Sequence, residues 1–208
     1  MSISNRKYKS YEEYLSHQKA KFDIGVRKKI KKFMPECFSK NVKCFEKRIN
    51  GFKKYVKQGK ILCLGARDGS EVVAFRNLDF LDTMGIDINP GKSNEYVIKG
   101  DFHNMEFDDN IFDTIYSNCI DHAWDLQKLS KEIHRVLKKD GYLILEIDHL
   151  LKKTEKDRRT LLGKKSKYES IMWENFKDIE KGFGEFKLII KFTGIYDIFL
   201  VAIFKRND

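Results

Sequence analysis

The chain has 208 residues, of which 41% are hydrophobic and 35% are charged, and its formal net charge is +10. This length suits one α/β domain with a short extension, and the hydrophobic content is sufficient for a full core, which argues against wholesale disorder. The sequence has no long apolar run and begins with a polar, basic segment. We therefore expect neither a membrane span nor a secretory signal, and a cytoplasmic protein.

The positive charge is concentrated in the N-terminal part of the chain. Residues 1–60 contain 18 Lys and Arg against 5 Asp and Glu, whereas residues 61–208 contain 23 and 26. Such a basic segment can attract phosphate groups on a substrate, an RNA or an acidic lipid surface. A solvated helical face in a lysine-rich protein is the other interpretation.

The four cysteines form no C-x-x-C pair; they are Cys37, Cys44, Cys63 and Cys119. This spacing favours free thiols in a reducing compartment over disulfides or a zinc site.

Two helices are predicted before the first strand. The first covers residues 8–21, and the second covers about residues 40–58 and ends at Gly59, with apolar residues at three- and four-residue steps in both. The segment between them, residues 25–34, is basic and ends before Pro35.

Short apolar segments alternate with helical patterns from Lys60 onwards. The expected strands are Ile61–Leu64, Thr83–Ile88, Tyr96–Lys99, Phe112–Ser117 and Tyr142–Ile147. The expected helices between them are Ser70–Asn77 and Leu126–Lys138. Because strands joined through helices make right-handed crossovers, this order predicts a parallel, doubly wound sheet.

The C-terminal segment has a different pattern. Lys152–Lys167 is predicted to be a charged loop, and Tyr168–Lys181 a helix. Glu185–Phe192 and Tyr196–Phe204 are predicted to form an antiparallel hairpin. We expect two regions, a basic helical extension or cap over residues 1–58 and a sheet domain over residues 59–208.

A glycine-containing loop follows the first expected strand. In doubly wound sheets, ligands bind beyond the carboxyl ends of the strands, where glycines allow close approach of the backbone. The loop runs from Gly65 to Gly69, and Asp87 ends the next strand, where a carboxylate can accept hydrogen bonds from both hydroxyls of a ribose. A dinucleotide would also fit, but Arg67 occupies the position where the dinucleotide fingerprint needs a second glycine beside the pyrophosphate. The terminal hairpin is a second argument against a dinucleotide-binding domain.

Five segments, in this order, resemble the motifs of class I S-adenosylmethionine-dependent methyltransferases: Ile61–Gly69, Gly85–Asn89, Gly100–Phe102, Phe112–Asn118 and His134–Tyr142. The resemblance covers roughly residues 60–206. It departs from the family at Cys63, where an acidic residue is usual, and at Arg67, where a glycine is usual. It implies a doubly wound, Rossmann-like, seven-stranded and mostly parallel sheet with a C-terminal antiparallel hairpin strand, plus the N-terminal helices.

The same resemblance implies S-adenosylmethionine as the cofactor. The implied cofactor-binding residues are Gly65, Ala66, Arg67, Gly69, Asp87, Ile88, Asp101, Phe102 and Asn118. Among them, Asp101 is expected at the adenine amino group, Phe102 beside the adenine ring, and Asn118 near the methionine moiety.

Methyl transfer from a sulfonium needs alignment of the acceptor, exclusion of water and often a base. Asp121 and His122 resemble a Glu-His pair of small-molecule methyltransferases, so His122 is the first candidate for the base, and His149, after the fifth strand, is the second. A purely structural role that anchors the loop is the alternative for His122. No His, Asp or Glu group has metal-binding spacing, so no metal is expected.

The leading functional hypothesis is methyl transfer to a small molecule, with an anionic or sugar-containing acceptor. Residues of the N-terminal part that could contact it are Tyr11, Tyr14, Arg27, Lys28 and Lys31. One alternative is an RNA or protein methyltransferase that docks through the basic extension. The other is a protein that binds S-adenosylmethionine without catalysis. The sequence leaves the oligomeric state open.

Overall fold

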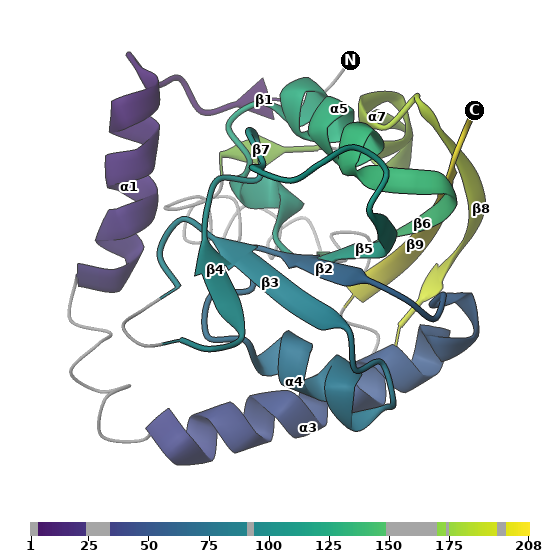
Figure 1. Cartoon of the computed structure of the whole chain (residues 1–208). Helices are drawn as coiled ribbons and strands as arrows, with labels where there is room; N and C mark the ends of the chain where they lie inside the picture. Colours follow the sequence, from purple (N-terminus) through teal and green to yellow (C-terminus); the bar gives the residue numbers. More distant parts are fainter. Residues whose placement is uncertain (1–3, 24–33, 91–93, 149–169, 174, 195–198) are drawn as a thin grey trace.

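The computed structural model describes residues 4–23, 34–90, 94–148, 170–173, 175–194 and 199–208. Its main feature is a seven-stranded sheet with the order β4-β3-β2-β5-β6-β9-β8 (Figure 1). The strands are β2 (Ile61–Leu64), β3 (Thr83–Asp87), β4 (Val97–Lys99), β5 (Phe112–Ser117), β6 (Leu137–Asp148), β8 (Phe186–Thr193) and β9 (Phe199–Arg206).

The strand directions confirm the predicted sheet. Strand β2 pairs in parallel with β3 and β5, and the outer pairs β3–β4 and β5–β6 are parallel as well. Strand β9 is antiparallel to both of its neighbours, β6 and β8. The chain is therefore a doubly wound α/β protein that ends in an antiparallel hairpin, as the sequence indicates.

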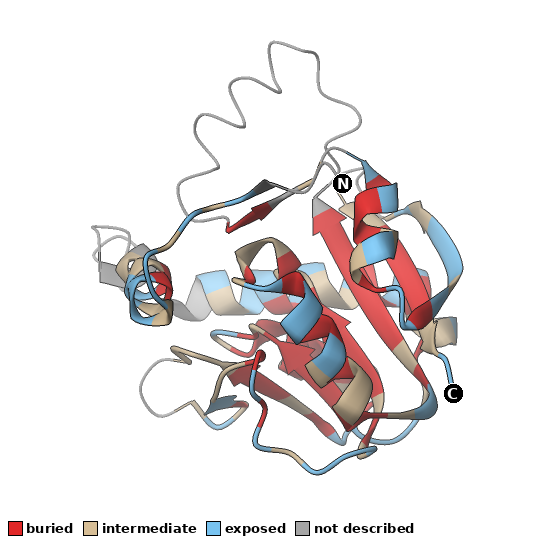
Figure 2. Cartoon of the chain, turned by 90° about the horizontal axis from the view of Figure 1, so that it is seen from above, coloured by how far each residue is buried: buried red, intermediate tan, exposed pale blue. Residues whose placement is uncertain are grey.

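Helices cover both faces of the sheet. Alternate residues of β2 point to opposite faces, so Ile61 packs with α3 (Met34–Phe52) and α4 (Ser70–Asn77), whereas Leu62 packs with α5 (Leu126–Val136) and α7 (Phe176–Gly182). All four residues of β2 are buried, as expected for a central parallel strand. Figure 2 shows this buried centre and the exposed outer surfaces of the helices.

The N-terminal helices differ in extent from the predicted ones. Helix α1 covers Tyr11–Asp23, and α3 covers Met34–Phe52, followed by the 3₁₀ turn Lys53–Tyr55. Helix α3 therefore begins before Pro35, because proline is accepted in the first turn of a helix. Val42, Ile49 and Phe52 of α3 belong to the core on the α4 face of the sheet. The division of the chain at residue 58 stays a prediction.

The predicted helix Tyr168–Lys181 is wrong in its first half. Ile171–Met172 is the short strand β7, which pairs with β1 (Ser4–Asn5), and α7 begins only at Phe176. Asn175 and Asp178 form a reciprocal capping box that fixes this start. Pairing with a segment more than 160 residues away cannot be predicted from local periodicity. Of the basic segment 25–34, residues 25–33 lie outside the described residues, and so does the predicted loop Lys152–Lys167.

Candidate active site

A pocket lies at the carboxyl ends of β2, β3 and β5, the edge where the sequence predicts a ligand. It is lined by Tyr14, Gln18, Asn41, Phe45, Gly65, Ala66, Arg67, Asp68, Glu71, Asp87, Ile88, Phe102, Asn118, Cys119, His122 and Phe199. The lining thus combines the loop after β2, the ends of β3 and β5, and side chains from α1, α3 and β9. Segments far apart in the sequence meet at this one site.

The loop after β2 is held against the end of β3 by backbone hydrogen bonds. The N–H groups of Gly65 and Ala66 both donate to the carbonyl oxygen of Ile86, at 2.8 and 3.2 Å. Gly65 has a φ of +67°, and a Cβ at this position would lie 2.2 Å from Cys119 Sγ. Any side chain would therefore be both strained and obstructed, which explains a glycine at this position.

Asp87 connects the end of β3 to the loop after β2. Its Oδ2 accepts the backbone N–H of Arg67 at 3.1 Å, and its Oδ1 accepts the backbone N–H of Asn89 at 2.7 Å. Arg67 has a φ of 37°, in the left-handed region that side chains seldom adopt. The carboxylate thus supports a strained loop residue and is held in a fixed orientation on the pocket wall.

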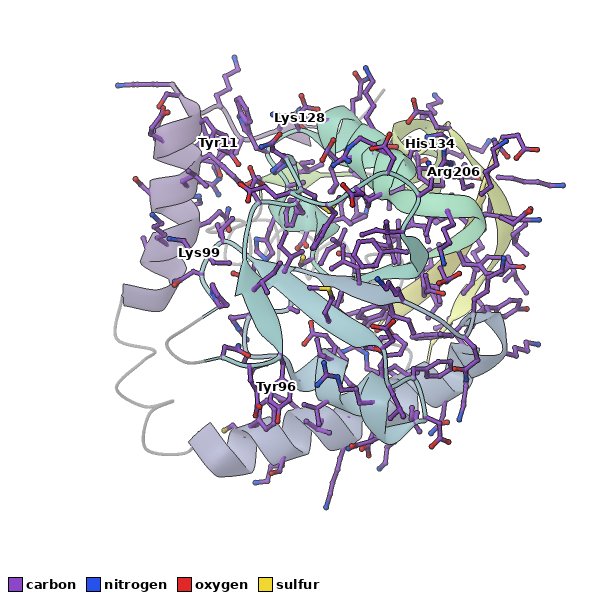
Figure 3. All side chains as sticks on the ribbon, viewed as in Figure 1. Tyr11, Tyr96, Lys99, Lys128, His134 and Arg206 are labelled. Atoms are coloured by element: carbon purple, nitrogen blue, oxygen red, sulfur yellow. The ribbon has the colours of Figure 1, made fainter. Side chains whose placement is uncertain are left out.

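Asp101 is bonded to α1 and to a buried histidine. Tyr11 donates its hydroxyl hydrogen to Asp101 Oδ2, and His103 donates from its backbone N–H and from Nδ1 to Oδ1, both at 2.9 Å. Burial raises the pKa of Asp101, but the hydrogen bonds from His103 and Tyr11 outweigh burial and bring the pKa below its usual value. Figure 3 shows Tyr11 directed from α1 toward the body of the domain.

His103 is fully buried and has a structural position. Its Nε2 lies 3.0 Å from the backbone N of Trp124 and accepts that N–H, so the ring hydrogen resides on Nδ1, facing Asp101. The ring therefore joins the loop after β4 to the loop before α5.

Helix α1 forms one side of the pocket. Tyr14 and Gln18 point into it from successive turns of the helix, and both are buried. Gln18 Nε2 donates to Ser170 Oγ at 3.1 Å, and Tyr14 stacks on Tyr11 with ring centroids 5.3 Å apart. These contacts hold α1 against the carboxyl edge of the sheet.

Helix α3 and strand β9 form another side. Phe45 and Phe199 line the pocket, and the guanidinium of Arg48 lies over both rings, 4.6 and 4.2 Å from their centroids. Arg48 is ion-paired with the buried Glu146 at 2.7 Å, and Glu146 also accepts the hydroxyl of Tyr116. This buried network supports the two aromatic side chains of the wall.

His122, the first candidate base, lies on the pocket wall in the 3₁₀ turn Ile120–His122, where its backbone N–H donates to the Cys119 carbonyl at 2.9 Å. His149, the second candidate, lies outside the described residues, as do Arg27, Lys28 and Lys31. The described residues contain no group of three or more His, Cys, Asp and Glu side chains placed to hold a metal ion.

Most residues that the sequence singles out meet at this pocket. Those on its wall are Tyr14, Gly65, Ala66, Arg67, Asp87, Ile88, Phe102, Asn118 and His122. Gly69 and Asp101 are not among the lining residues: Gly69 is the N-cap residue of α4 with a φ of +81°, and Asp101 faces Tyr11 and His103.

Sequence reasoning missed several lining residues. They are Gln18, Asn41, Phe45, Asp68, Glu71, Cys119 and Phe199. The helical spacing of Tyr11, Tyr14 and Gln18 could have indicated Gln18, whereas Phe199 carries no local signal because the sheet topology alone brings it here.

Part of the chain matches a known family model and a curated protein. Residues 62–145 match the family model described as a methyltransferase domain. An alignment of 102 positions, which covers 41% of this chain, shows 33% identity to the sterol 24-C-methyltransferase of Aspergillus fumigatus. That alignment spans only 27% of the length of the fungal protein.

Solved structures share the fold over nearly the whole chain. A chain from a complex that contains the Trm112 methyltransferase activator of Haloferax volcanii has a TM-score of 0.64 at 14% identity, covering 94% of this chain and 98% of that one. A Thermotoga maritima protein described as a possible histamine N-methyltransferase has a TM-score of 0.62 at 19% identity, covering 93% and 100%. Within the described ranges, no helix has the length and apolar character that crossing a membrane requires.

The matched family model spans β2 to β6, and the sheet order and the terminal antiparallel strand agree with the fold of the methyltransferase structures. Residues 62–145 are similar to the methyltransferase domain family, and the chain shares its fold with solved S-adenosylmethionine-dependent methyltransferases.

Proposed function

We propose that this protein transfers a methyl group from S-adenosylmethionine to a small-molecule acceptor that enters the pocket at the carboxyl edge of the sheet. One observation carries the proposal: the loop after β2, Asp87 and Asn118 share a pocket that side chains of α1 and α3 also border. An acceptor in that pocket meets Tyr14 and Phe45 as well as the cofactor loop. Such a bordered pocket favours a small acceptor over the surface of a macromolecule.

The residues present fit the cofactor. The Gly65–Asp68 backbone lines the pocket without a side chain at Gly65, where a Cβ would strike Cys119. Asp87 presents a carboxylate whose orientation is fixed by two backbone N–H groups, which suits a ribose diol. Phe102, buried on the wall, offers an apolar surface for an adenine ring.

Asp101 has a different role in this proposal from the one that the family resemblance implies. Its carboxylate binds Tyr11 and His103, so we assign it to holding α1 and the β4 loop at the adenine end of the pocket. We likewise assign Gly69 to the packing around the pocket instead of to direct contact with the cofactor. A Cβ there would lie 2.7 Å from Tyr96 Cβ, so glycine permits the close packing that places α4.

When bound, the cofactor supplies an electrophilic methyl group on a sulfonium. The protein then has to orient the acceptor, exclude water and, for an oxygen or a protonated nitrogen, take up a proton. His122 lies on the same wall as Asn118 and Cys119, and we propose that its imidazole accepts that proton. His149 remains a second candidate on the basis of its sequence position.

Within the small-molecule class, we propose an anionic or sugar-containing acceptor. The proposal depends on the basic residues Arg27, Lys28 and Lys31, which follow α1 in the sequence, and on Arg67, which lines the pocket. The similar proteins differ in their descriptions: one is named a sterol methyltransferase, and another is described as a possible histamine N-methyltransferase. They support small molecules as a class and do not select one member.

The test is transfer of label from methyl-tritiated S-adenosylmethionine to three fractions of a cell extract: small molecules, RNA and protein. Label in the small-molecule fraction, lost in His122→Ala, supports the proposal. Label in RNA or protein instead favours an enzyme that docks through the basic N-terminal region. Binding of S-adenosylmethionine without transfer to any fraction favours a non-catalytic binding protein, and absence of binding refutes all three.

A further inference from the structure

Glu71 is a buried carboxyl group on the wall of the pocket. It lies in the first turn of α4, directly after the Gly65–Gly69 loop, and the residue is only 4% exposed. Among the described residues, no Lys, Arg or His lies within ion-pair distance of its carboxylate. A charge that is withdrawn from water in this way is costly unless a counter-ion is supplied.

Charged and titratable groups face Glu71 from every adjoining element. Burial raises the pKa of Glu71 to about 8; its own backbone N–H and the guanidinium groups of Arg67 and Arg48 lower the pKa, and the Asp68 carboxylate raises it further. The other neighbours are Cys63 on β2, Tyr116 on β5 and Cys119 after β5, and burial raises the pKa of each. Without a further cation in the pocket, Glu71 holds its proton at neutral pH.

The other two carboxylates of the wall already accept hydrogen bonds. Asp68 Oδ1 accepts both the backbone N–H and the hydroxyl of Ser70, at 3.1 and 2.7 Å. Asp87 accepts the N–H groups of Arg67 and Asn89. Glu71 differs from both because its carboxyl group interacts with its own backbone N–H.

S-adenosylmethionine carries an α-ammonium group at its methionine end, and a buried ammonium needs an anion. The residue two before Gly65, where the family usually has an acid, is Cys63, which is fully buried and is not among the lining residues. Its thiol stays neutral because burial raises its pKa well above the usual value. The buried acidic side chain next to the glycine loop is therefore supplied by α4 instead of β2.

We propose that Glu71 binds the α-ammonium group of S-adenosylmethionine and releases its carboxyl proton to solvent as it does so. This inference rests on the proposed function. The O–H bond of the carboxyl group breaks, the electron pair stays on the carboxylate, and the proton passes to the buffer. The ammonium group keeps all its hydrogens and donates to the carboxylate. No bond of the cofactor changes in this step.

The experiment is calorimetric titration of the full chain with S-adenosylhomocysteine at pH 7, in buffers of different ionisation enthalpy. The slope of the binding enthalpy against the ionisation enthalpy counts the protons released. We expect close to one proton per ligand for the wild type. Glu71→Gln should release none and should bind at least about 10-fold more weakly, the effect of losing one charge-assisted hydrogen bond.

A ligand without the amino acid portion isolates the proposed contact. Methylthioadenosine should bind the wild type and Glu71→Gln equally well, with no proton released. Glu106→Gln, an exposed carboxylate outside the pocket, should behave as the wild type with both ligands. Equal losses of affinity for both ligands in Glu71→Gln would show general damage to the pocket and overturn the proposal.

The wild type provides a readout that does not depend on how the variant folds. If it binds S-adenosylhomocysteine without releasing a proton, the role of Glu71 is refuted while the proposed function stands. If it binds neither ligand, the proposed function fails first, and the inference falls with it.

Discussion

The backbone N–H of Arg67 donates to Asp87 Oδ2 across 3.1 Å, and this hydrogen bond joins the loop after β2 to the end of β3. The two residues are 20 positions apart in the sequence, and parallel pairing of β2 with β3 brings them together. The contact fixes a carboxylate on the pocket wall and supports a loop residue with positive φ. Asp87 therefore determines the shape of the pocket and also contributes a negative charge to its wall.

Replacement of Asp87 by Ala should weaken binding of S-adenosylmethionine by about 1.5–3 kcal/mol, the scale of hydrogen bonds to a charged group. Calorimetric titration measures this loss. Asp87→Asn retains an acceptor for the Arg67 N–H, so it should lose less. Asp108→Ala removes an exposed carboxylate outside the pocket and is the matched control. An unchanged affinity in Asp87→Ala would exclude the ribose role.

Replacement of Tyr11 by Phe removes the hydroxyl that binds Asp101 and should loosen α1. Burial and the hydrogen bond to Asp101 raise the pKa of Tyr11, so the hydroxyl keeps its proton over the accessible pH range. We expect a loss of about 1 kcal/mol in the free energy of unfolding, the value typical of one hydrogen bond. Urea denaturation of Tyr11→Phe beside Tyr55→Phe, on the 3₁₀ turn after α3, measures it. Equal stabilities of the two variants would mean that the Tyr11–Asp101 contact does not hold α1.

Replacement of His122 by Ala should reduce turnover by about 100-fold or more if its imidazole takes the acceptor proton. Affinity for S-adenosylmethionine should stay nearly constant, because the proposed role concerns the acceptor. His134→Gln, on α5 with its ring against Phe186, is the control and should keep wild-type turnover. A His122→Ala variant with normal turnover would remove this residue from the mechanism, and His149→Ala would then be the next variant to measure.

The stability of the ligand-free protein should depend on pH through Glu71. Burial raises its pKa from 4.5 to about 8. Because the folded state binds the proton more tightly than the unfolded state, the stabilisation is complete below about pH 4.5. It declines as the pH rises towards 8 and is absent above that value.

Glu71→Gln lacks this titration. Its melting temperature relative to the wild type should therefore increase from pH 5 to pH 9. Glu106→Gln should show no such trend. A difference between Glu71→Gln and the wild type that is constant over this range would mean that Glu71 is not a buried, protonated acid.

The sequence predicts the sheet well because its information there is local. Ile61–Leu64 and Phe112–Ser117 are short apolar runs, and the structure has strands with the same bounds. Ser70–Asn77 is likewise a helix with the predicted limits. Tyr142–Ile147 is only part of a longer strand, Leu137–Asp148, because pairing with β5 and β9 extends it.

The pocket residues that the sequence did not predict reach the pocket through long-range packing. Phe199 lies at the start of β9, opposite Asp148 in the antiparallel pair, so sheet topology alone brings it to the carboxyl edge. In the sequence, Glu71 looks like an ordinary acidic residue in the first turn of a helix. Only the three-dimensional structure shows that it is buried. The β1–β7 pair is also a long-range feature that the sequence does not predict, since each strand has only two residues.

The most direct measurement is a crystal structure of the full chain with S-adenosylhomocysteine. We expect the ribose hydroxyls on Asp87, the adenine against Phe102, and the α-ammonium group on Glu71, with the sulfur facing the space beside His122. A ligand bound elsewhere, or one that enters this pocket with its ribose away from Asp87, would show that this pocket is not the cofactor site.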